Sequence, residues 1–166
     1  MEFTRRISQL LHEDHAATIA LIEAQENMIA AARATPPDAN DPKIRETLDS
    51  TAALIDHEVR HHFTFEEDEL FTRLEEAGDV GISMHLREEH AAILPLGERV
   101  GELAAAALEK GFDAASWAEF RNNAGELIER MLAHIQKEEM ALLPILDDLL
   151  DGETDMELSE LFAAEG

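Results

Sequence analysis

The 166-residue sequence contains no cysteine, no tyrosine, one tryptophan and few basic residues. The absence of cysteine excludes disulfide bridges, thiolate metal sites, iron–sulfur clusters and cysteine nucleophiles. Thirteen lysine and arginine residues stand against 37 acidic ones, which gives a formal charge of −24. Because phosphate contacts need clustered basic side chains, this balance argues against nucleic acid and against an anionic membrane surface as partners.

Long apolar runs are absent as well. No stretch approaches the roughly 18 residues of a membrane span. The two arginines near the start of the sequence are not followed by the apolar stretch of a secretory signal. We therefore expect a cytoplasmic protein. What the acidic sequence does have is eight histidines, and their placement carries the functional information.

Helix signals dominate, and no run of β-branched residues alternates as a strand would. The sequence predicts an all-α, up-down-up-down antiparallel four-helix bundle over residues 1–152 and an acidic, solvated tail helix over 153–166. Expected helices span about 3–33, 42–77, 82–110 and, from 113 or 116, to about 152. The expected helix ends are at Pro36-Pro37, at the turn from Gly78 to Gly81 and at Gly111. The expected helix starts are an Asp41 cap before Pro42 and a capping box of Ser116 with Glu119. Pro95 and Pro144 are expected to bend their helices.

An internal repeat is the most informative feature. The segments Leu11–Ala17 and Leu86–Ala92 both read L-x-E-[D/E]-H-A-A. The segments His62–Phe71 and His134–Leu143 both read H-x-x-x-E-E-x-x-L-[F/L]. The chain therefore resembles two related helical hairpins, each with one lone histidine and one His–Glu pair.

In an antiparallel bundle these histidines reach nearly the same height, since each residue advances a helix by about 1.5 Å. A His and a Glu four residues apart also share a helix face. The predicted core-facing metal ligands are His15, His62, Glu66, His90, His134 and Glu138. Buried carboxylates cost several kcal/mol each when uncompensated. Either both glutamates are protonated or cations lie between them, and two divalent metals bridged by two carboxylates would use every group.

Other histidines receive less specific interpretations. We expect His85 with Glu89 to form a solvated ion pair, and His12 to lie at the surface or just outside the site. His57 and His61 are expected at the surface or at the site entrance. A salt bridge and an extra metal ligand are equally good roles for Glu58.

Over residues 5–150 the order lone His, H-x-x-x-E, lone His, H-x-x-x-E resembles the hemerythrin-like family, also called the HHE cation-binding domain. The resemblance implies a non-haem di-iron centre with an oxo or hydroxo bridge, the six residues above as ligands, and the two glutamates bridging; zinc or manganese is the alternative metal. Two positions depart from the respiratory members. Leu86, with His85 beside it, stands where they have a further histidine, and Glu139 rather than Glu138 has their His–carboxylate spacing. These departures argue against reversible oxygen carriage.

The resemblance leads to one functional expectation and one alternative. We expect a di-iron protein that binds, senses or reduces O₂, NO or peroxide, with or without enzymatic turnover. The alternative is a non-catalytic iron or oxygen sensor, or a metal-binding bundle, that a protein partner recognises. The ferritin-like di-iron class is set aside because it uses Glu-x-x-His, whereas here the histidine comes first and the glutamate follows four residues later.

Overall fold

The structure is a computed structural model that describes residues 2–165, except for the side chains of residues 57, 58 and 165. All regular elements in this described part are helical. Three of them, η1 to η3, are π-helical turns that continue directly from an α-helix. The elements are α1 (Arg6–Ala32), α2 (Pro42–Leu54), η1 (Ile55–Val59), α3 (Arg60–Phe65), η2 (Glu66–Phe71), α4 (Thr72–Glu76), α5 (Val80–Lys110), α6 (Ala114–Lys137), η3 (Glu138–Leu142), α7 (Leu143–Leu149) and α8 (Gly152–Glu165).

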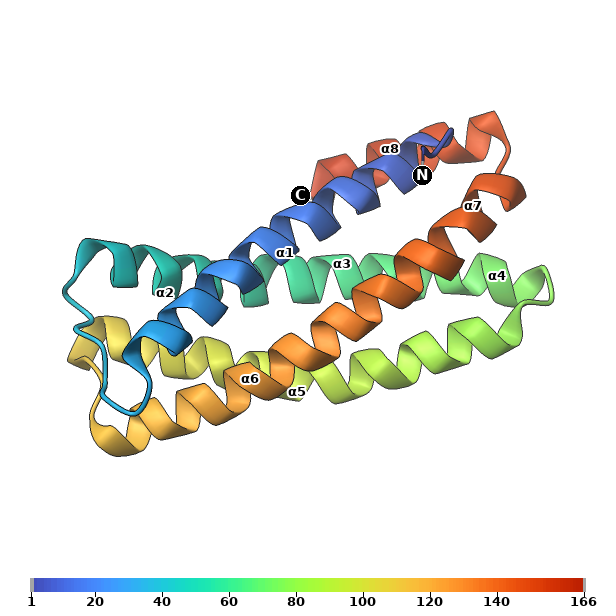
Figure 1. The fold of residues 1–166 in the computed structure, drawn as a ribbon. Helices are drawn as coiled ribbons and strands as arrows, with labels where there is room; N and C mark the ends of the chain where they lie inside the picture. The colour runs from blue at the N-terminus through green and yellow to red at the C-terminus, as the bar shows by residue number, and fades with distance from the viewer. Residues whose placement is uncertain (1, 166) are drawn as a thin grey trace.

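The elements join into long helical runs that lie side by side. The run α2–η1–α3–η2–α4 is unbroken, and so is the run α6–η3–α7. Together with α1 and α5 these runs alternate in direction along the chain (Figure 1). Contacts join α1 to α2 and α6, α2 to α5, and α5 to α6. In this described part, no helix combines the length and apolar character that crossing a membrane requires.

The helix boundaries follow local capping chemistry. Asp41 accepts hydrogen bonds from the backbone N–H groups of Lys43 and Ile44, as expected of a cap before Pro42. The expected Ser116–Glu119 capping box is wrong, because Asp113 is the cap and Ser116 is its partner. Asp113 and Ser116 are both residue types that cap helices, and the helix starts after the earlier of the two.

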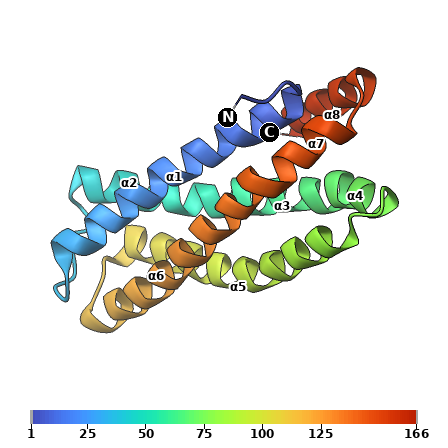
Figure 2. The ribbon, with the colours of Figure 1, turned by 45° about the vertical axis from the view of Figure 1, so that its right-hand side comes forward.

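Helix α8 corrects the expectation of a solvated tail. It packs along the first part of α1 (Figures 1 and 2), and Leu158 and Phe162 on its inner face are buried. The Asp155 carboxylate accepts hydrogen bonds from the N–H groups of Arg6 and Ile7, both at 2.9 Å. It therefore binds donors that the first turn of a helix leaves unpaired. The acidic composition of the tail concealed this apolar face.

Two apolar clusters fill the interior. One contains Leu48, Val100, Trp117 and Phe120 at the end of the helical runs distant from α8 (Figure 1). The other contains Ile7, Leu11, Phe71, Leu86, Leu142 and Phe162 at the end that α8 covers. The histidines of the repeat lie between these clusters, so the polar site is enclosed by apolar packing on both sides.

Candidate metal centre

The structure brings all six predicted side chains together. His15 comes from α1, His62 from α3, Glu66 from η2, His90 from α5, His134 from α6 and Glu138 from η3, and all six are buried. They form two groups that could each hold a metal ion. The first group is Glu66, His90, His134 and Glu138, and the second is His15, His62 and Glu138.

Each glutamate reaches histidines from both halves of the repeat. Glu66 Oε1 lies 3.4 Å from His62 Nε2 and 3.3 Å from His90 Nε2. Glu138 Oε1 lies 2.6 Å from His134 Nε2 and 3.8 Å from His15 Nε2. Both carboxylates therefore occupy bridging positions between the two histidine pairs.

The donor atoms of the site fit a cation. Both carboxylate oxygens of Glu66, Glu138 Oε2 and His15 Nε2 are buried and have no hydrogen-bond partner among the described residues. A buried polar atom without a partner costs about 1–3 kcal/mol, and more when it is charged. Inward-facing imidazole nitrogens and carboxylate oxygens are ligands that divalent iron, zinc and manganese accept. The residues present thus match a metal site.

The two buried carboxyl groups titrate in opposite directions. Burial raises the pKa of Glu138, and the negative charge of Glu66 raises it further. Burial also pushes the pKa of Glu66 upward, but the charge of His62 and the close polar contacts with Glu138 and His90 outweigh burial and bring that pKa well below its usual range.

The pKa values of His62 and His134 are raised by the same carboxylates. Burial alone would lower the pKa of His134, but Glu138, Glu66 and Glu89 raise it to about 9. Burial also opposes the shift at His62, and Glu66, Asp14 and Glu138 outweigh it to hold that pKa well above its usual value. Protons and metal ions compete for these nitrogens, since a ligating histidine must be neutral.

Aromatic rings and a small cavity surround the site. The Phe63 ring stacks on His90 with ring centres 3.7 Å apart, and Phe162 meets the His62 ring edge-on at 6.2 Å. A cavity of about 20 Å³ is lined by His15, His62, His134 and Glu138 on the polar side and by residues that include Val59, Phe63, Met131 and Ile135 on the other. This space is sufficient for one water-sized molecule, which needs about 10–15 Å³.

Two of the π-helical turns begin at the site carboxylates. η2 starts at Glu66 and η3 starts at Glu138, which are equivalent positions of the repeat. A π turn inserts an extra residue into a helix and is frequent at functional sites. Sequence reasoning expected uninterrupted helices here and missed both turns. Leu143 follows η3 and donates its N–H to Glu138 O, and Pro144 comes next, so the proline lies in the first turn of α7.

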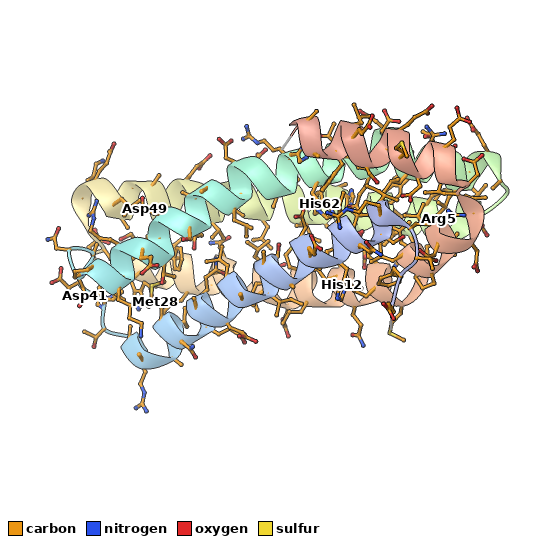
Figure 3. All side chains as sticks on the ribbon, turned by 90° about the horizontal axis from the view of Figure 1, so that it is seen from above. Arg5, His12, Met28, Asp41, Asp49 and His62 are labelled. Atoms are coloured by element: carbon orange, nitrogen blue, oxygen red, sulfur yellow. The ribbon has the colours of Figure 1, made fainter. Side chains whose placement is uncertain are left out.

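The other histidines with described side chains, His12, His61 and His85, lie outside the two groups that could hold a metal. His12 is exposed, and its Nδ1 lies 2.8 Å from Glu139 Oε1. Figure 3 shows His12 and His62 in the half of the molecule that contains Arg5, opposite Met28 and Asp41. The His61 ring stacks on Phe162. The predictions for the side chains of His57 and Glu58 fall outside the described residues.

His85 and Glu89 correct one expectation. They form the predicted pair, with His85 Nε2 3.4 Å from the Glu89 carboxylate. Glu89 is only 19% exposed, however, and also lies 2.9 Å from Nδ1 of His134. The pair is therefore attached to the candidate metal centre rather than solvated, because helix α5 turns Glu89 toward α6.

Glu139 has a similar place outside the cluster. Its Oε1 lies 2.9 Å from His15 Nδ1, on the outer side of that ring, whereas Glu138 lies within the cluster. Among the described residues, the carboxylate four residues after His134 is the one that faces the other ligands.

Comparison with known families identifies the family of the chain. The hemerythrin HHE cation-binding domain matches residues 6–146 of the chain. The chain therefore belongs to the hemerythrin family. No curated protein matches it. Helix α8 begins after the matched segment ends.

Proposed function

We propose that this protein holds two iron ions and binds or reduces a small oxidant or diatomic gas at them: O₂, NO or peroxide. The observation that carries the proposal is the pair of buried groups of possible ligands that share Glu138. One ion would be held by His15 and His62, the other by His90 and His134, with Glu66 and Glu138 reaching both. Zinc or manganese also suits these ligands.

The proposal includes the architecture around the centre. Alternating long helical runs, with one ligand set on each hairpin, support an up-down-up-down four-helix bundle. In this proposal α8 is an appended helix after a bundle that ends near residue 152, because its inner face packs on α1. We also propose a cytoplasmic location, supported by the absence of cysteine.

When bound, two irons would supply the electrons for ligand binding or reduction. The chain's own residues determine what reaches them. The cavity beside His15, His62, His134 and Glu138 has space for about one water-sized molecule. Its walls of Val59, Phe63, Met131 and Ile135 are apolar, which favours uncharged ligands such as O₂, NO and hydrogen peroxide over ions.

The test is anaerobic reconstitution of the full chain with Fe(II), followed by metal counting and absorption spectra before and after adding O₂, peroxide or NO. We expect about two ions per chain, as a carboxylate-bridged pair requires, and a visible band after oxidation. Fewer than about one ion per chain with no band contradicts the proposal. Peroxide consumption that disappears in His62→Ala indicates turnover, whereas metal-dependent melting without consumption indicates a sensor.

A further inference from the structure

Each histidine of the candidate metal centre turns Nε2 into the cluster and Nδ1 toward a carboxylate outside it. The distances from Nδ1 to the nearest carboxylate oxygen are 2.9 Å for His15 to Glu139, 3.6 Å for His62 to Asp14, 3.6 Å for His90 to Glu67 and 2.9 Å for His134 to Glu89. None of these four carboxylates belongs to the groups that could hold a metal.

The four carboxylates follow the internal repeat. Asp14 precedes His15 and reaches His62 of the next helical run. Glu89 precedes His90 at the equivalent position and reaches His134, again on the next run.

The second pair follows the site glutamates. Glu67 comes after Glu66 and reaches His90 on α5. Glu139 comes after Glu138 and reaches His15 on α1. Every outer carboxylate therefore sits beside a site residue of one run and contacts the histidine of a neighbouring run, so the contacts form a closed ring around the bundle.

This geometry has a definite chemical consequence. A neutral imidazole carries one proton, and a carboxylate at Nδ1 holds the proton there, which leaves the Nε2 lone pair for a metal. The same contact fixes the orientation of the ring and makes the ligating nitrogen more basic. Without the outer carboxylate, the proton could reside on Nε2 and block ligation.

We propose that Asp14, Glu67, Glu89 and Glu139 form an outer carboxylate ring that positions the four histidines and sets the metal affinity. This inference rests on the metal binding proposed above. Glu89 and Glu139 make the larger contribution, because each lies within hydrogen-bond distance of its histidine. Asp14 and Glu67 lie at 3.6 Å, which is an ion-pair distance only.

The two close carboxylates are also held from outside. Lys137 Nζ pairs with Glu89, and His12 Nδ1 lies 2.8 Å from Glu139. Glu89 and Glu139 are 19% and 23% exposed, whereas Asp14 and Glu67 are 31% and 35% exposed. A carboxylate that is less solvated and already anchored loses less freedom when it orients a ring.

The experiment uses the full chain with Co(II) as a spectroscopic probe and Fe(II) as the proposed metal. The variants are Glu89→Gln, Glu139→Gln, Asp14→Asn and Glu67→Gln, with Glu88→Gln as the matched control because Glu88 is exposed beside Glu89. An amide both donates and accepts, so it no longer selects one imidazole tautomer. Metal affinity is measured by chelator competition, together with the Co(II) absorption spectrum and the melting of the metal-free protein.

We expect Glu89→Gln and Glu139→Gln to weaken metal binding about 10–100-fold with altered Co(II) spectra, the range typical of carboxylates behind a histidine ligand. Asp14→Asn and Glu67→Gln should weaken it less, and Glu88→Gln should not change it. The melting temperature of the metal-free protein should fall too little in any of the five variants to account for the lost affinity, and Glu89→Asp should retain more affinity than Glu89→Gln.

Two results would overturn the ring. The first is wild-type affinity and spectra in Glu89→Gln and Glu139→Gln. The second is a fall in metal affinity that is fully explained by a fall in the stability of the metal-free protein. Such a result would mean that the carboxylate contributes to packing rather than to the orientation of the histidine. If wild-type protein itself binds neither Co(II) nor Fe(II), the proposed function fails and the ring fails with it. If wild type binds both metals normally, either of the first two results rejects the ring alone.

Discussion

The two halves of the repeat have equivalent candidate metal ligands and differ in the residues that lie behind them. Each half has a lone histidine, a His–Glu pair and a π-helical turn that begins at the glutamate. Behind the ligands, Lys137 pairs with Glu89 in the second half. The equivalent position in the first half is Phe65, which is buried against Phe162 and offers no charge to Asp14.

A second pair of equivalent positions shows the same difference. His12 contacts the Glu139 carboxylate. Its counterpart Arg87 donates instead to Glu75 at 2.8 Å and to the backbone oxygen of Glu67 at 3.0 Å. The Glu67 carboxylate is left at 3.6 Å from its histidine. The repeat therefore gives both halves the same candidate ligands, while the residues that differ between its two copies change which partners the outer carboxylates have.

The largest expected effect comes from removing a ligand that both halves use. Glu138→Gln should abolish binding of both irons, because Glu138 reaches His134 and His15. His15→Ala should remove a ligand from one metal position only. Both losses should exceed the roughly 10–100-fold effect of an outer residue. Metal counting after Fe(II) reconstitution measures the difference, with circular dichroism confirming that each variant is folded. Equal losses in the two variants would show that the halves are not separate metal positions.

Metal removal should lower stability in both halves together. A ligand present at 100 times its Kd stabilises the folded state by about 2.7 kcal/mol. For a chain of this size that corresponds to a fall in Tm of roughly 5–10 °C when the metal is removed. Calorimetry with and without chelator measures it, and hydrogen exchange should show lost protection around Glu66 and Glu138 alike. If protection from exchange were lost around only one of the two glutamates, the two halves would not be equivalent in metal binding.

The starts of the two hairpins provide a third contrast. α1 begins with backbone N–H groups bound by Asp155 from α8, whereas the Asp79 side chain makes no capping hydrogen bond at the start of α5. Asp155→Asn should therefore cost about 1–3 kcal/mol, because the amide oxygen replaces only one of the two carboxylate acceptors and leaves the other N–H without a partner. Asp79→Asn should stay within about 0.5 kcal/mol. Urea unfolding compares the two variants, and similar values would show that α8 does not anchor α1.

Much of this organisation could be predicted from the sequence. His and Glu four residues apart must share a helix face, and the repeat fixes their spacing, so the six clustered side chains followed from counting residues. The helix limits at Asp41 and Gly111 followed from capping and left-handed turn chemistry, and the structure confirms both.

The π turns and the outer carboxylates could not be predicted in the same way. Tertiary packing decides whether a segment forms a π turn or continues as a straight α-helix. The only local signal was the adjacent apolar pairs Leu70-Phe71 and Leu142-Leu143, all four of which are buried. The outer carboxylates contact histidines on other helices, so their roles depend on how the helices face each other. The fold of α8 onto α1 depends on long-range contacts that its acidic composition obscured.

The smallest effect on metal affinity is expected at Lys137. This residue tests most directly the difference between the two halves of the repeat. Lys137→Met gives position 137 an uncharged side chain like that of Phe65, so Glu89 loses the ammonium group that holds it. We expect metal affinity to fall less than tenfold, below the effect of Glu89→Gln, because the carboxylate itself remains beside His134. Arg130→Met is the matched control, since Arg130 is on the same helix and pairs with Glu126. Chelator competition on the full chain measures both variants. An effect as large as that of Glu89→Gln would show that Lys137 acts on the metal centre by more than anchoring Glu89, and wild-type affinity would show that Glu89 holds its position without it.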